Sequence, residues 1–481
     1  MTNRSQQKKH KVAQNANRQA PVEKVLQKSN TNVDIPKENN EELEKRQESK
    51  SIVEKVEQAQ KDIDLEAESD PNQSTTSGKE TDRDKEEPKK YSMIDPGPLT
   101  CMTNIPGLAF DFNYGARVSV PEGNWRVRIK DRGMGVVLYD STVSNAVVAS
   151  TKKFFINFRI EVYKDSNLVL EHDLNLKGRR VLIKYPKGAL GDNLAWFPYS
   201  QIFKYTHGCE LYCSIEKHLS DILKPAYPDI NFIEPEEKLD GVYATYHMGI
   251  FFPCSDRVNQ PVDFRVVGLQ KNIPYILGLK PDELRPVLLP NNKERKIKEP
   301  YVCIAAQSTS QAKYWNNPTG WLEVVKHLKS KGYRVLCIDR ESVHGNGSRW
   351  NTIPYGSEDF TGLLPLQERI DLLYHADFFV GLSSGLSWLA WGVGKPIVMI
   401  SGFTLPHNEF YTPYRAINYH VCNGCWNDST VEFVHADFAW CPRNKDTDSQ
   451  FECSRFITSD SVKQLIDKLM GDYNFPTKKQ E

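Results

Sequence analysis

The pattern of apolar and polar residues begins with a long segment that lacks any hydrophobic periodicity. Residues 1–90 contain no Phe, Tyr or Trp and are dominated by Gln, Asn, Ser, Lys and Glu. Such a segment buries too little apolar surface to offset the conformational entropy that is lost on ordering. We therefore predict a disordered N-terminal tail over these residues.

The next segment, residues 91–175, has the pattern of a small β-rich domain. Apolar residues alternate with polar ones in runs at 117–120, 125–129, 136–139, 153–163 and 167–170. Alternation with a period of two, broken by Gly- and Asp-containing turns, is typical of antiparallel strands. No residue in this segment indicates chemistry of its own.

From residue 176 the pattern changes to alternating strands and helices in two units, 176–290 and 291–481. In the first unit we expect strands at 181–185, 210–215, 230–233, 242–246 and 264–267, with a helix at 193–203. In the second unit we expect strands at 301–306, 334–338, 377–380 and 396–400, with helices at 319–330, 365–376 and 385–392. Such alternation predicts two doubly wound parallel sheets, joined by the charged, Pro-bearing stretch 280–300. Ligands of these folds bind at the carboxyl ends of the strands, so we expect the site in a cleft between the two units.

Composition and charge exclude several classes of function. The 62 Lys and Arg residues balance 62 Asp and Glu residues, which gives no global attraction to nucleic acid or anionic membranes. The basic N-terminus has no apolar run behind it, unlike a secretory signal, and no segment reaches the roughly 18 apolar residues of a membrane span. We therefore expect a cytoplasmic protein.

A glycine-containing turn after the strand expected at 181–185 is the first candidate for chemistry. It reads Gly188-Ala-Leu-Gly191-Asp192 and leads into a helix. Glycines let the backbone pass close to a substrate, and a helix N-terminus favours negative charge. Asp192 would either cap this helix or project into the cleft as a general base. The glycine spacing differs from G-x-G-x-x-G, which argues against a dinucleotide cofactor.

Two turns of the second unit could bind a diphosphate. Ser308, Thr309 and Lys313 follow the strand at 301–306, and a lysine beside hydroxyl donors suits phosphate oxygens. The other turn, Ser383-Ser384-Gly385, leads from a strand into a helix whose free N–H groups point at the turn. Each turn could equally be a structural loop.

A carboxylate follows a third strand of this unit. Glu341 comes after the strand at 334–338 and could accept hydrogen bonds from ribose hydroxyls. A solvent-exposed carboxylate is the alternative interpretation.

Four cysteines near the C-terminus, Cys422, Cys425, Cys441 and Cys453, have the spacing C-x2-C-x15-C-x11-C. Four thiolates suit Zn²⁺ or iron, and a closed site of this kind is structural because it leaves no coordination position for a substrate. The residues alone favour zinc in a cytoplasmic protein. We expect the remaining cysteines to be free thiols, mostly buried; they are Cys101, Cys209, Cys213, Cys254, Cys303 and Cys337.

The order of these motifs resembles that of the ADP-heptose heptosyltransferases of the GT-B class. The match comprises the Gly188–Asp192 turn, Lys313 before two aromatic residues and the turn at Ser383. The lipopolysaccharide enzymes usually carry Asp at the position of Ser383, which argues against that branch. With the cysteine quartet and the stretch 188–198, the chain is similar to the bacterial autotransporter heptosyltransferases from about residue 95 to its end.

The resemblance implies an α/β fold of GT-B type with two Rossmann-like domains, an acceptor-side domain over 176–290 and a donor-binding domain over 291–481. It implies that Asp192 is the base of an inverting transfer of heptose from ADP-heptose to Ser or Thr hydroxyls of an autotransporter adhesin. The implied donor contacts are Ser308, Thr309, Lys313, Glu341, Leu364 beside the adenine, Ser383, Ser384 and Gly385. It also implies one structural iron held by the four cysteines, with zinc as the alternative, and assembly into homo-oligomers.

Other classes of protein stay open at this point. A heptosyltransferase acting on lipopolysaccharide, or another nucleotide-sugar transferase, shares the same motifs. A metal-knuckle protein that binds nucleic acid would need a basic surface, whereas Asp428, Glu432 and Asp437 lie near the cysteines. An electron-transfer protein of the rubredoxin kind would need two C-x2-C pairs, and this chain has one.

Overall fold

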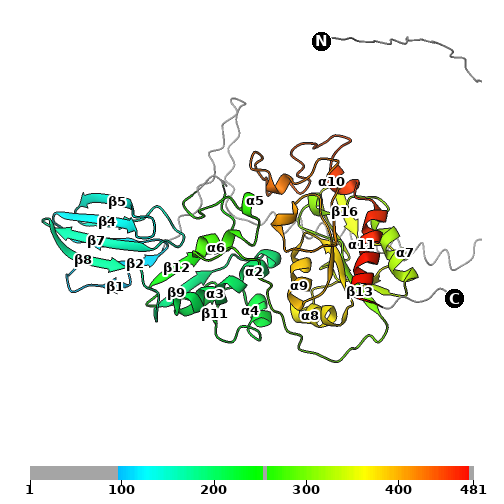
Figure 1. Ribbon diagram of the computed structural model, residues 1–481, viewed down its shortest axis with the longest axis horizontal. Coiled ribbons are helices and arrows are strands. Elements are labelled where there is room, and N and C mark those ends of the chain that lie inside the picture. Colours follow the sequence, from blue (N-terminus) through cyan, green and yellow to red (C-terminus); the bar gives the residue numbers. More distant parts are fainter. Residues whose placement is uncertain (1–95, 253–256, 476–481) are drawn as a thin grey trace, which may run out of the picture. The chain divides into compact units, whose positions relative to one another are not determined.

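Figure 1 shows the computed structural model of the chain, which describes residues 96–252 and 257–475. The tail predicted over residues 1–90 lies outside the described residues, and so does Cys254. The described residues contain two large sheets with helices packed on them and a separate four-stranded sheet.

The first large sheet has a parallel part and an antiparallel extension. Its strand order is β11-β10-β9-β12-β2-β3-β6, with β1 paired to β2. The parallel part comprises β9 (Arg180–Lys184), β10 (Glu210–Ser214), β11 (Asn231–Ile233) and β12 (Ala244–His247). The extension comprises β1 (Cys101–Met102), β2 (Ala109–Asn113), β3 (Arg117–Val120) and β6 (Ala146–Ala149). Strands from the predicted β-rich segment therefore continue the first Rossmann-like sheet, because β2 pairs in parallel with β12.

The other strands of the β-rich segment form an antiparallel sheet of their own, in the order β5-β4-β7-β8 (Figure 1). They are β4 (Trp125–Asp131), β5 (Val136–Val143), β7 (Phe158–Lys164) and β8 (Asn167–Asp173). One face buries Trp125, Val127 and Ile160, as the alternating pattern predicts. The opposite face carries ion pairs such as Arg126 with Asp140 at 2.7 Å.

Five helices lie in the first half of the described residues, and two sequence predictions fail among them; the short α5 packs against η2 and η3 of the second half. The helices are α2 (Leu190–Trp196), α3 (Pro198–His207), α4 (Lys217–Leu223), α5 (Phe264–Val267) and α6 (Asn272–Leu277). The single helix predicted over 193–203 is two helices, because Pro198 starts a new one at its N1 position. The strand predicted over 264–267 is wrong. Asp263 caps a short helix there, its carboxylate accepting from the backbone N–H of Arg265 at 3.0 Å.

The second large sheet is entirely parallel, in the order β17-β14-β13-β18-β19-β20. Its strands are β13 (Tyr301–Ala305), β14 (Arg334–Cys337), β17 (Glu358–Asp359), β18 (Phe379–Leu382), β19 (Ile397–Ile400) and β20 (Arg415–Ala416). In Figure 1, α8 (Leu366–His375) and α9 (Gly385–Val393) cover one face, and α7 (Gly320–Ser330) and α11 (Ser459–Asp472) cover the other. The central strands are buried on both faces, which explains their continuous apolar runs.

Short elements complete the second half. They are the hairpin β15 (Val343–Asn346) and β16 (Arg349–Thr352), the 3-10 turns η1 (Gln311–Lys313), η2 (Pro406–Asn408) and η3 (Cys425–Asn427), and α10 (Glu452–Arg455). No helix of the described residues is both long and apolar enough to cross a bilayer. The predicted buried free thiols are confirmed for Cys209, Cys213, Cys303 and Cys337, and Cys101 is free and half-buried.

Of the contacts between helices of the two halves, the most extensive joins α2 and α9, whose N-termini touch. A Cβ atom on Gly191 would lie 3.1 Å from the Cα of Gly385 and 3.0 Å from the Trp388 ring. A Cβ on Gly385 would lie 3.1 Å from the Cβ of Leu190. Such distances are shorter than ordinary van der Waals contacts, so only glycine fits both positions without a shift. The contact brings Asp192 close to the turn at Ser384.

The tight junction predicts that Gly385→Ala lowers the free energy of unfolding by about 1–3 kcal/mol, because the added methyl group overpacks the contact. Gly471→Ala is the matched control, since nothing lies within 4 Å of a Cβ at that helical position. Alanine there should leave stability unchanged or raise it by about 0.5–1 kcal/mol. Thermal and denaturant unfolding of both variants measures the difference. A Gly385→Ala protein as stable as Gly471→Ala would contradict the close contact.

Candidate active site

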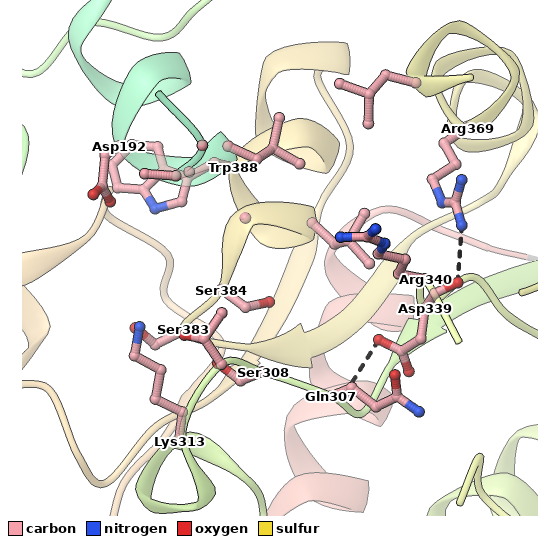
Figure 2. Close-up of a pocket in the computed structure, with 18 of the residues that line it drawn as sticks. Asp192, Gln307, Ser308, Lys313, Asp339, Arg340, Arg369, Ser383, Ser384 and Trp388 are labelled. Atoms are coloured by element: carbon pink, nitrogen blue, oxygen red, sulfur yellow. Dashed lines mark hydrogen bonds between the residues drawn. The ribbon is translucent and has the colours of Figure 1, made fainter. Parts of the chain in front are cut away.

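A cavity of about 1010 Å³ lies where the N-terminus of α2 faces the carboxyl ends of β13, β14 and β18. All of the residues predicted for the site line it: Asp192, Ser308, Thr309, Lys313, Glu341, Leu364, Ser383, Ser384 and Gly385. Asp192 and Lys313 lie on one side of the cavity, and Gln307, Asp339 and Arg369 lie on the other (Figure 2). The roles of these residues stay predictions, but their common location is a property of the structure.

Asp192 lies in the first turn of α2 and is not its N-cap. The N-cap position belongs to Ala189, at φ 50°. No donor among the described residues hydrogen-bonds the Asp192 carboxylate, which is partly exposed to the cavity and otherwise enclosed by protein. Burial raises its pKa to about 6, and the positive charge of Lys313 opposes that shift. A carboxylate in this state can take up a proton near neutral pH.

Hydrogen bonds hold the turn that carries Asp192. The Glu216 carboxylate accepts from the N–H of Gly188 at 2.6 Å. The Asn193 amide donates to the carbonyl of Gly188 at 2.7 Å and to that of Pro186 at 3.1 Å. Gly188 at φ 70° and Ala189 at φ 50° both lie in the left-handed region, which costs energy for alanine. The turn is therefore held in one unusual backbone conformation at the edge of the cavity.

Lys313 ends η1, and its ammonium group lies among aromatic rings and carboxylates. Its Nζ atom is 6.0 Å from the ring centroids of both Phe403 and Trp426. Burial lowers the pKa of Lys313, and the carboxylates of Asp192 and Glu409 oppose the shift. An ammonium group in this setting is poorly solvated, which strengthens its attraction for an anionic ligand.

Two residues that the sequence analysis missed organise the opposite wall (Figure 2). The buried Asp339 carboxylate accepts from the backbone N–H groups of Ala306 at 2.8 Å and Gln307 at 3.2 Å. The Arg369 guanidinium donates to four backbone carbonyls at 2.7–3.0 Å: Ile338, Asp339, Gly362 and Leu364. These bonds fix the loops that present Ser308, Glu341 and Leu364. Asp339 lies two residues after the end of β14, so its position after a strand was an available signal; Arg369 lies within α8 and offered none.

The turn at Ser383 leads into α9 as predicted. Ser384 is the N-cap residue of this helix, and the first turn contains no acidic side chain. The first N–H groups of any helix lack intrahelical partners, so this end carries partial positive charge that its own side chains do not offset. It therefore offers a second positive region beside Lys313 on the cavity wall.

Glu409 is a further residue that the sequence analysis missed. It is buried at the cavity wall and pairs with Arg415 at 2.9 Å. Its carboxylate also accepts from the Asn408 amide at 2.8 Å and from the Ser383 hydroxyl. Glu409 follows a 3-10 turn with no recognisable motif, so no sequence signal indicated it.

Three cysteines of the quartet, Cys422, Cys425 and Cys441, belong to an aromatic cluster beside the cavity. Cys425, Cys441 and Cys453 are buried, Cys422 is half-buried, and all four are free. Burial raises the pKa of Cys453 to about 12, and Cys425, Cys441 and Cys422 contribute to the shift. The Arg443 guanidinium lies 3.6 Å from the sulfurs of both Cys422 and Cys425. Within the described ranges, however, no three His, Cys, Asp or Glu side chains have an arrangement that could hold a metal ion.

The cysteine-bearing segment contacts the segment that carries Lys313. The backbone N–H of Gln311 donates to the Phe438 carbonyl at 2.9 Å, and the Ser310 hydroxyl donates to the same oxygen at 3.3 Å. Ala312 packs into the aromatic cluster of the cysteines. Trp426, next to Cys425, lines the cavity itself. The cysteine-bearing segment therefore forms part of the cavity wall and packs against the segment that carries Lys313.

Comparisons with known protein families match two parts of the chain. Residues 106–166 match the family described as glycosyltransferase TibC, N-terminal domain. Residues 270–436 match glycosyltransferase family 9 (heptosyltransferase). The second match covers the segment that contains Lys313, Ser383 and Glu409.

Three relatives are similar over most of their length. The autotransporter heptosyltransferase BAHTCr of Citrobacter rodentium is 53% identical over 78% of this chain and 92% of its own. TibC of Escherichia coli is 51% identical over 79% of this chain and 94% of its own. A crystal structure of TibC is described as that of a dodecameric iron-containing heptosyltransferase in complex with ADP-D-beta-D-heptose. It matches this structure with a TM-score of 0.77 at 50% sequence identity, over 79% of this chain and 100% of that one. BimC of Burkholderia thailandensis, named an inactive autotransporter heptosyltransferase, is 40% identical over 78% of this chain and 89% of its own.

The raised pKa of Asp192 predicts that Asp192→Asn stabilises the fold at alkaline pH. An unfolded carboxyl ionises near its ordinary pKa of 3.8 and the folded one near 6, so the fold loses stability as the pH rises through this window. At pH 8 the neutral amide should raise the free energy of unfolding by about 1–3 kcal/mol, and near pH 4 the gain should vanish. Denaturant unfolding of both proteins at the two pH values measures it. A variant less stable than the parent at pH 8 would show that the ionised carboxylate does not destabilise the fold.

Proposed function

This chain belongs to the autotransporter heptosyltransferase family, and we propose that it transfers heptose from ADP-heptose to Ser or Thr hydroxyls of an autotransporter adhesin. One observation supports the chemistry most strongly. Asp192, with no hydrogen-bond donor on its carboxylate among the described residues, shares a cavity with Lys313 and the N-terminus of α9. A base and a positive leaving-group site on one cavity are what transfer from a nucleoside diphosphate sugar requires.

In the proposed donor complex, the nucleotide lies along the carboxyl ends of the second sheet. Glu341 accepts from the ribose hydroxyls, and Leu364 packs against the adenine. Lys313, Ser308 and Thr309 contact the diphosphate, together with the turn at Ser384. The sugar then lies beside α9, near Asp192, because α9 and α2 touch at their N-termini.

The proposed step is a single displacement with inversion. The acceptor hydroxyl loses its proton to the Asp192 carboxylate while its oxygen forms a bond to the anomeric carbon. The bond between that carbon and the diphosphate oxygen breaks, and its electron pair leaves with ADP. Lys313 and the N-terminus of α9 stabilise the added negative charge of the leaving group. Positive groups fixed in place before the reaction need no reorganisation as that charge develops.

We propose that the four cysteines hold a structural iron, since TibC is described as iron-containing. The donor set is chemically suited to iron, because one stretch of the chain supplies four soft thiols, three of them buried, with the Arg443 guanidinium beside two of them. In the described residues the thiols are not arranged as a metal site, so binding would require them to move together. Bound metal would crosslink this segment, which has few long apolar runs of its own. Zinc is the alternative metal for the same ligands.

The assembly and location of the protein also belong to the proposal. TibC is described as a dodecamer, and we propose that this chain forms homo-oligomers as well. We further propose that it acts in the cytoplasm, on an adhesin that has not yet been exported. The acceptor would be the passenger domain of that adhesin.

Two other functions compete with this one. A transferase acting on lipopolysaccharide would use the same donor and the same base, so the acceptor distinguishes it. A chain without transferase activity is the second, since BimC is named inactive at 40% identity. Incubation with ADP-heptose and either a passenger domain or a lipid acceptor separates all three.

We expect Asp192→Ala to abolish transfer to the passenger domain, with a loss of at least about 10²-fold in kcat, because no base remains to take the proton. ADP affinity should stay within about twofold of the parent, since Asp192 does not contact the nucleotide in the proposed complex. The parent should lose activity as the pH falls through about 6, the pKa of Asp192, because only the ionised carboxylate accepts a proton.

Mass spectrometry of the passenger domain and isothermal titration with ADP make these measurements. Glu161→Gln is a suitable control, as it changes a buried carboxylate in the separate four-stranded sheet. Near-normal glycosylation by Asp192→Ala would overturn the assignment of the base.

The metal proposal predicts about one iron per chain in protein purified under aerobic conditions, measured by elemental analysis. Cys441→Ser/Cys453→Ser should lose the metal and melt at a lower temperature, because the site then retains two thiol ligands. Cys101→Ser should keep both metal content and melting temperature, since that thiol lies outside the quartet. Stoichiometric zinc would replace iron in the proposal, and parent protein without metal would refute it.

A further inference from the structure

The buried carboxylate of Glu409 fixes what the Ser383 hydroxyl can recognise. Glu409 forms an ion pair with Arg415, whose side chain is 7% exposed while that of Glu409 is 1% exposed. An ionised carboxylate is a hydrogen-bond acceptor only. The contact between the two residues therefore requires Ser383 to donate its single proton to Glu409.

A serine that has committed its proton presents only lone pairs to a ligand. Ser383 lines the cavity two residues before the start of α9. It can accept a hydrogen bond from a hydroxyl group, but it cannot donate one to a phosphate oxygen. Glu409 thus gives the serine the hydrogen-bonding character of a carboxylate without exposing a negative charge to the diphosphate.

The position of Ser383 selects the hydroxyl. In the second sheet β13 lies between β14 and β18, so the loop that carries Glu341 after β14 and the turn that carries Ser383 after β18 lie on opposite sides of the carboxyl end of β13. The Lys313 ammonium lies on the Ser383 side, because it interacts electrostatically with Glu409, the hydrogen-bond partner of Ser383 (Figure 2). A nucleotide with its ribose at Glu341 and its diphosphate at Lys313 therefore directs its sugar toward Ser383 and α9. The adenosine part points the other way.

We propose that Glu409 is a positioning residue for donor recognition, acting through Ser383 so that the serine accepts a hydrogen bond from a hydroxyl of the transferred sugar. This inference rests on the proposed function, because it assumes a nucleoside diphosphate sugar in the cavity. Asn408 and Arg415 hold the carboxylate in place from its other sides, at 2.8 and 2.9 Å. Glu409 itself stays behind the serine and does not touch the sugar.

The test compares the affinities for ADP and ADP-heptose by isothermal titration, without any acceptor. Ser383→Ala should weaken ADP-heptose binding about tenfold, the usual effect of losing one hydrogen bond, and leave ADP within about twofold. Glu409→Gln should lower the ratio of ADP-heptose affinity to ADP affinity by a similar factor, because a glutamine amide can donate to the serine and release its proton. Its effect through the charge of Lys313 should be the same for both ligands, which share the diphosphate. Ser220→Ala and Glu161→Gln are the matched controls, since both residues are buried and lie outside the cavity.

The double variant Ser383→Ala/Glu409→Gln distinguishes a positioning role from an independent one. If Glu409 acts through Ser383, the double variant should bind ADP-heptose no more weakly than Ser383→Ala alone. Additive losses would overturn the inference, and so would equal losses for ADP and ADP-heptose. Glu409→Gln could lower the melting temperature more than Glu161→Gln does, because it leaves the buried Arg415 guanidinium without its carboxylate partner. In that case the double variant Glu409→Gln/Arg415→Gln removes the guanidinium as well. It should show the same selective loss of ADP-heptose affinity.

The outcome for the parent protein separates this inference from the proposed function. Parent protein that binds ADP-heptose but shows no selective loss in the variants overturns the role of Glu409 alone. Parent protein that does not bind ADP-heptose overturns the proposed function, and this inference with it.

Discussion

The backbone contact between Gly191 and Gly385 is the constraint on which the site depends. It joins the N-termini of two helices that belong to different sheets, at a separation that no side chain could occupy without a shift. Because Asp192 follows one glycine and Ser384 precedes the other, the contact fixes the distance between the candidate base and the candidate leaving-group site. It also places the partial positive charges of two helix ends on one cavity. If the N-termini of α2 and α9 lay farther apart, Asp192 and the turn at Ser384 could not both contact the same bound sugar nucleotide.

Negative and positive side chains alternate along the cavity wall, and the charge state of each depends on its neighbours. Asp192 and Glu409 both act electrostatically on Lys313, and Arg415 neutralises Glu409 from behind. Burial alone would favour neutral Asp192 and neutral Lys313, and their mutual attraction opposes this. The cysteine segment belongs to the same arrangement, because Trp426 lies near the lysine and lines the cavity. The quartet is therefore adjacent to the chemistry, although it supplies none of the groups proposed for it.

Much of the fold could be predicted from local patterns. The buried parallel strand at 301–305 is a continuous apolar run, and the strand at 334–337 is apolar after Arg334. Their carboxyl ends identified Ser308, Lys313 and Glu341 as cavity residues. Local patterns failed where a single residue outweighs hydrophobicity. Asp263 caps a helix over the apolar run 264–267, and Pro198 divides the helix expected over 193–203. Pairing of β2 with β12 is a long-range contact, which periodicity within one segment cannot reveal. Periodicity also cannot reveal the roles of Arg369 and Glu409. Arg369 bonds backbone carbonyls that are distant in the sequence, and Glu409 bonds Ser383 in another turn.

A crystal structure of the protein with ADP-heptose tests the central claim most directly. The account predicts that the diphosphate contacts Lys313 and the first N–H groups of α9, with the anomeric carbon facing the Asp192 carboxylate across the space of one hydroxyl group. It also predicts unchanged backbone contact between Gly191 and Gly385. A diphosphate bound away from Lys313, or an anomeric carbon that faces away from Asp192, would contradict it.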